Sequence, residues 1–169
     1  MPITFQNSTN DDPISAAGYL KFLPRATRDT WLGALFIMNA RGEPVEFVHS
    51  RVRAPRSVMW RAADLELRCL ESLCTSMFQA CPVVPDILLC LDREVGPSLF
   101  GERICLEMPV ARISLDESTG EIVSEWVVEP PHNSAQCRLL DSISDRGLLL
   151  EPFERAEVGL REVYKDLLQ

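Results

Sequence analysis

Five arginines and one tryptophan fall within one short stretch of the sequence. They are Arg51, Arg53, Arg56, Trp60, Arg61 and Arg68. A guanidinium group binds phosphate and carboxylate oxygens through two parallel hydrogen bonds, and tryptophan and arginine are frequent anchors of interfaces. These residue types predict a binding surface for a protein partner or for the backbone of a nucleic acid. The alternative is a solvated surface whose arginines pair with nearby acidic side chains.

Carboxylates close to predicted strands could support metal-dependent chemistry. Asp86 begins and Asp92 ends a predicted buried strand, while Glu46 and Glu107 fall within other predicted strands. Two-metal nucleases gather such carboxylates around Mg²⁺. An RNase H-like nuclease would also carry an aspartate on its first central strand, and the candidate for that strand, residues 31–38, contains none. A metal-dependent nuclease is therefore an alternative, and it would use Asp92 together with other carboxylates.

Other catalytic and cofactor signatures are missing from the sequence. It contains no G-x-S-x-G nucleophile elbow, no G-x-G-x-x-G dinucleotide loop and no phosphate-binding P-loop. The six cysteines form no C-x-x-C pair, and only two histidines are present, so the spacing of a zinc site is not found. We therefore predict no catalytic residue, no metal ligand and no cofactor. Whether the protein is an enzyme is left open, although the missing signatures argue against enzymatic activity.

Charge is distributed unevenly along the chain. The 169 residues carry a formal net charge of −8, which argues against a free-standing nucleic-acid binder because such proteins usually present a strongly basic face. Residues 82–130 hold three basic and ten acidic side chains, whereas residues 1–81 hold nine and eight. The arginine-rich stretch lies in the nearly neutral part, so the objection from net charge does not apply to it.

No secretion signal or membrane segment is expected. The N-terminus lacks a basic start followed by an apolar core, and no apolar run approaches the roughly 18 residues that a membrane-spanning helix needs. The cysteines are then expected to be small buried side chains in a reducing compartment. We predict a cytoplasmic protein with no membrane partner.

The pattern of apolar residues in the sequence predicts the strands that must position these residues. Runs that are apolar almost throughout predict strands buried on both faces, and runs bounded by turn residues predict hairpins. Five or six strands are expected, at residues 17–23, 31–38, 45–52, 85–92, 103–115 and 121–128.

Two helices are expected beside these strands. Residues 57–81 carry one narrow polar stripe on a mostly apolar surface, which predicts one long central helix with Ser57 as its N-cap. Residues 151–168 predict a C-terminal helix with Pro152 in its first turn. The expected fold is a single α+β domain, residues 16–169, with a mostly antiparallel five- to six-stranded sheet. A flexible N-terminal arm, residues 1–15, precedes this domain.

Three functions are compatible with these observations. The favoured one is a non-catalytic subunit or adaptor of a prokaryotic multi-protein complex, which acts through contacts with a protein partner or with a second copy of itself. The second is an accessory of a nucleic-acid-processing or phage-defence complex that contacts nucleic acid through the arginine-rich stretch. The third is the metal-dependent RNase H-like nuclease.

Overall fold

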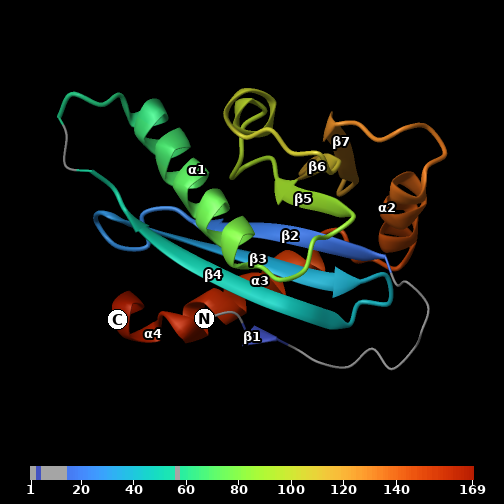
Figure 1. The fold of residues 1–169 in the computed structure, drawn as a ribbon, viewed down its shortest axis with the longest axis horizontal. Helices are drawn as coiled ribbons and strands as arrows, with labels where there is room; N and C mark the ends of the chain where they lie inside the picture. The colour runs from blue at the N-terminus through green and yellow to red at the C-terminus, as the bar shows by residue number, and fades with distance from the viewer. Residues whose placement is uncertain (1–2, 5–14, 56–57) are drawn as a thin grey trace.

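The computed structural model describes residues 3–4, 15–55 and 58–169, and within them the strands form a single sheet (Figure 1). The sheet has seven strands in the order β1-β4-β3-β2-β5-β6-β7. Their bounds are β1 Ile3–Thr4, β2 Ala16–Leu23, β3 Thr30–Asn39, β4 Pro44–Arg53, β5 Ile87–Leu91, β6 Val110–Leu115 and β7 Ile122–Val128.

The sheet is mixed, with antiparallel pairs in the majority. β2, β3 and β4 form consecutive antiparallel hairpins, and β7 is antiparallel to β6. β5 runs parallel to β2, and β6 runs parallel to β5. β5 is parallel to β2 because the chain leaves β4, crosses one face of the sheet as a helix and returns on the other side of β2. A second connection, residues 92–109, makes β6 parallel to β5. The predicted α+β class is confirmed, but β2, and not the strand predicted at 31–38, is the central strand.

The helices cover both faces of the sheet. α1 Ala62–Ala80 lies across one face, and α3 Glu151–Val163 lies on the opposite face (Figure 1). α2 Ala135–Asp145 and α4 Lys165–Leu168 belong to the same side as α3, and η1 Leu99–Arg103 is a short π-helical turn beside α1. Because β2 and β3 have helices on both faces, their side chains are buried almost throughout, as their unbroken apolar sequences predict.

Both predicted helices differ from the observed ones at specific residues. α1 begins at residue 62 and not at 57, because the backbone of Arg61 is still extended. Ser57, the predicted N-cap, lies outside the described residues. The predicted C-terminal helix at 151–168 is interrupted at Tyr164, whose φ of −108° and ψ of 24° separate α3 from α4.

The predicted N-terminal arm lies largely outside the described residues. Within the predicted arm, Ile3–Thr4 forms β1, which pairs antiparallel with β4, and residues 5–14 are not described. The division into an arm and a single domain stays a prediction. No helix in the described part of the chain is long and apolar enough to cross a membrane.

His49 on β4 connects the sheet to the C-terminal helices, and its partial burial predicts a pH dependence of folding. Its Nδ1 lies 2.9 Å from the hydroxyl oxygen of Tyr164. Burial lowers the pKa of His49, so the folded protein disfavours the protonated ring relative to the unfolded chain. The resulting contribution to stability is present above the unfolded pKa of about 6.5 and is lost as the pH falls below it.

We therefore expect the free energy of unfolding to fall between about pH 7 and pH 5, and to fall less in the variant His49→Gln. Urea unfolding of both proteins at the two pH values measures this difference. Equal losses in the two proteins would contradict the role given to His49.

Candidate functional site

The structure divides the predicted arginine surface between the two sides of the sheet. Val52 on β4 packs into the core beneath α1, and successive side chains of a strand point to opposite faces. Arg51 and Arg53 therefore face the side of the C-terminal helices, where they line a hollow with Leu167. Burial raises the pKa of Tyr164, and the positive charge of Arg51 partly offsets this rise. Arg56 lies outside the described residues.

The other predicted residues gather at the start of α1, on the opposite side of the sheet. The guanidinium carbon of Arg68 lies 5.2 Å from the centre of the Trp60 ring, a cation–π arrangement. The side chain of Arg61 is 90% exposed, and its Nε lies 3.4 Å from a carboxylate oxygen of Asp64. Trp60 itself is 38% exposed. One half of the predicted surface is thus a compact cationic and aromatic group.

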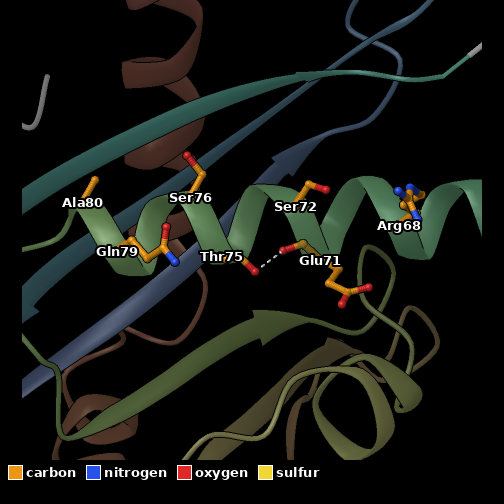
Figure 2. Close-up of a pocket in the computed structure, with 7 residues that line it drawn as sticks. All are labelled: Arg68, Glu71, Ser72, Thr75, Ser76, Gln79 and Ala80. Carbon is orange, nitrogen blue, oxygen red and sulfur yellow. Dashed lines mark hydrogen bonds between the residues drawn. The ribbon is translucent and has the colours of Figure 1, made fainter.

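A polar groove of about 690 Å³ continues from Arg68 along α1 (Figure 2). Apart from Arg68, its lining is Glu71, Ser72, Thr75, Ser76, Gln79 and Ala80. Arg68, Glu71, Thr75 and Gln79 belong to the polar stripe that the sequence shows on this helix. Thr75 Oγ1 donates a hydrogen bond to the carbonyl oxygen of Glu71 at 2.8 Å, and Ser50 Oγ on β4 donates to Ser76 Oγ at 3.0 Å.

A second hollow, of about 390 Å³, opens where β2 and β5 end. On one side of β2 the sheet continues with the antiparallel strands β3 and β4. On its other side the sheet continues with the parallel strands β5 and β6. Ligands of open α/β sheets commonly bind at such a reversal of strand order. Sequence reasoning singled out only Asp92 here. The charged residues that line the hollow are Lys21, Asp92, Arg93, Glu117, Glu154 and Glu157.

Lys21 is the centre of a buried ion-pair network beside this hollow. Its ammonium group pairs with Glu94, and it lies 3.3 Å from Oε2 of Glu157 on α3. The other carboxylate oxygen of Glu94 accepts a hydrogen bond from the backbone N–H of Phe22 at 3.0 Å. Although burial acts to raise the pKa of Glu157, hydrogen bonds from Arg161 and Lys21 hold that pKa below its usual value.

The residues at this hollow do not fit a divalent metal ion. The nuclease alternative needs an aspartate on the central strand, and β2 presents Lys21 there, with its ammonium between the carboxylates of Glu94 and Glu157. Within residues 3–4, 15–55 and 58–169, no group of three or more His, Cys, Asp and Glu side chains is arranged to hold a metal ion.

The other carboxylates considered for a nuclease site are not brought together. Asp86 lies before β5, where it accepts a hydrogen bond from the backbone N–H of Ala16, at the opposite end of that strand from Asp92. Glu46 is fully buried in β4. Glu107 lies in the loop before β6 and not in a strand, because β6 starts only at residue 110.

Comparison with known proteins finds limited structural similarity. No protein-family model and no curated protein sequence matches the chain. The crystal structure of endonuclease V from Streptomyces avermitilis is 14% identical with a TM-score of 0.47, over 69% of this chain and 53% of that one. Endonuclease V from Bacillus subtilis is 18% identical with a TM-score of 0.37, over 59% of this chain and 43% of that one. This chain thus spans about half of their length.

These comparisons correct the favoured functional expectation. The two structures named above are described as endonucleases, and on this finding the prediction of a non-catalytic adaptor that acts through protein–protein contacts is wrong. At these TM-scores the likeness assigns no role to any residue of this chain.

Proposed function

We propose that this protein binds nucleic acid through the start of α1, as an accessory of nucleic-acid-processing machinery. The observation that carries the proposal is the Trp60–Arg68 pair, which stands beside the exposed Arg61 and opens into the polar groove. Phosphate and sugar oxygens accept hydrogen bonds from guanidinium, hydroxyl and amide groups, and these are the groups present along α1. A protein partner, a cytoplasmic location and a phage-defence setting stay predictions.

The acidic total charge of the chain is compatible with this surface. Electrostatic fields in physiological salt extend over a Debye length of about 8–10 Å, so the acid-rich residues 82–130 act mainly on their own surroundings. Near the groove, Arg103 of η1 lies 3.9 Å from Glu71 and partly neutralises it. Asp64 is similarly paired with Arg61. The acidic side chains of α1 therefore oppose an approaching phosphate less than their number suggests.

Charge reversal at two positions tests the proposal. We expect the double variant Arg61→Glu with Arg68→Glu to bind a labelled oligonucleotide at least about tenfold more weakly than the unmodified protein. The slope of log affinity against log salt concentration should decrease by about two, because two phosphate contacts are lost. Fluorescence polarisation titrations at several salt concentrations measure both quantities.

The matched control reverses two arginines elsewhere on the surface. Arg41 in the turn between β3 and β4 and Arg146 after α2 are both exposed, so Arg41→Glu with Arg146→Glu makes the same change in net charge. We expect this control to bind nearly as the unmodified protein does. Equal weakening by both double variants, or no binding by the unmodified protein at low salt, would overturn the proposal.

The same samples incubated with Mg²⁺ separate binding from cleavage. We expect the oligonucleotide to stay intact, because Lys21 occupies the space between the two carboxylates. Mg²⁺-dependent cleavage that Asp92→Asn abolishes would show instead that the hollow beside β5 is a nuclease site.

A further inference from the structure

We infer that the ligand is single-stranded nucleic acid, with one base stacked on Trp60 and its backbone running along the groove of α1. This inference rests on the proposed function and adds the class of strand and the position of a base. It depends on two features that the arginines alone do not require: a partly open indole ring and a row of hydroxyl groups.

The first feature is the position of Trp60. Trp60 precedes α1, because Arg61 still has an extended backbone with a ψ of 144°. The two residues before Trp60, Val58 and Met59, are 101% and 89% exposed. Arg68 holds the ring by its cation–π contact, yet 38% of the residue stays accessible. By contrast, Trp31 is only 5% exposed and belongs to the core.

An aromatic ring in this setting discriminates between kinds of strand. Bases in a duplex are stacked on one another and are not available to a protein ring, whereas unpaired bases can be splayed out and stacked on aromatic side chains. Such stacking tolerates any base, because every base has a flat aromatic face. Trp60 therefore favours a single strand and does not by itself read a sequence.

The second feature is the row that leads away from the ring. Arg68, Ser72 and Ser76 are spaced by four residues and follow one line along α1 (Figure 2). Thr75 and Gln79 lie on the neighbouring line of the same groove. With a rise of 1.5 Å per residue, the distance from Arg68 to Gln79 is roughly 16 Å, which is enough to follow several nucleotides. The hydroxyl groups of Ser72 and Ser76 and the amide of Gln79 can donate hydrogen bonds to successive phosphates, whereas the hydroxyl of Thr75 already donates to Glu71.

Binding measurements with matched strands test the inference. We expect a labelled single-stranded oligonucleotide to bind about tenfold more tightly than the duplex of the same length and salt. Trp60→Ala should weaken single-strand binding by about tenfold and change duplex binding little, whereas Trp60→Phe should retain most of the affinity. Ser72→Ala with Ser76→Ala tests the row separately and should weaken single-strand binding severalfold.

A spectroscopic readout separates stacking from a general loss of structure. Tryptophan fluorescence of the unmodified protein should be quenched by the single strand, and most of this quenching should disappear in Trp60→Phe. The inference would be overturned if the duplex bound as tightly as the single strand or more tightly, or if Trp60→Ala left single-strand affinity unchanged. The proposed function would still stand in that case, provided that the arginine reversals weaken binding. Failure of every nucleic acid to bind would overturn both.

Discussion

Replacement of Lys21 by methionine is expected to lower the free energy of unfolding by about 3–5 kcal/mol. The side chains of Lys21 and Glu94 are 5% and 8% exposed, so the carboxylate of Glu94 would lose its counter-charge in a place that water hardly reaches. Removal of one member of a buried ion pair is far more damaging than removal of both. Urea unfolding followed by circular dichroism measures the change.

The double variant Lys21→Met with Glu94→Gln is the control for this result. A neutral amide has no charge to compensate, and its oxygen can still accept the hydrogen bond from Phe22 N–H that Glu94 accepts now. We expect the double variant to recover most of the lost stability. If its loss equalled the sum of the losses of Lys21→Met and of Glu94→Gln measured singly, the two charges would not be coupled, and the network drawn around Lys21 would be wrong.

Truncation of Phe153 to alanine is expected to destabilise the protein by about 3–5 kcal/mol. Phe153 is 2% exposed, and its ring meets the Tyr19 ring edge-on, with the ring centres 5.2 Å apart. This contact fixes α3 to the central strand β2. The loss combines the lost burial of the ring with the cavity that it leaves, because the surrounding core collapses only in part.

Two further variants calibrate this measurement. Phe153→Leu keeps much of the buried volume and should lose less stability than the alanine variant. Val158→Ala, on the exposed side of the same helix, should change stability by no more than about 0.5 kcal/mol. If Phe153→Ala were as stable as Val158→Ala, the ring would not anchor α3 as the structure indicates.

Local sequence patterns were sufficient to predict most elements. The apolar runs at 31–38 and 85–92 predict strands covered on both faces, and β3 and β5 are buried in this way. The polar stripe on residues 57–81 predicts a helix with one open face, which is the face that forms the groove of α1. The helix start was wrong, because Arg61 continues as extended chain.

The candidate surface was predicted only in part, because adjacency in sequence does not decide which face a side chain takes. Arg51 and Arg53 are close in sequence to Trp60, but alternation along β4 turns them toward the C-terminal helices. Trp60, Arg61 and Arg68 stay together because they follow one another into the same helix.

The Lys21 network was missed entirely, and the one local signal for it is a lysine inside the otherwise apolar strand 16–23. Sequence alone determined which segments are buried strands and helices, since that information is carried by neighbouring residues. Only the tertiary structure decided that Lys21 meets Glu94, 73 positions away, and Glu157 of α3. The physical reason is that the crossover through α1 lays β5 parallel to β2, and pairing between such distant segments leaves no periodic trace in either of them.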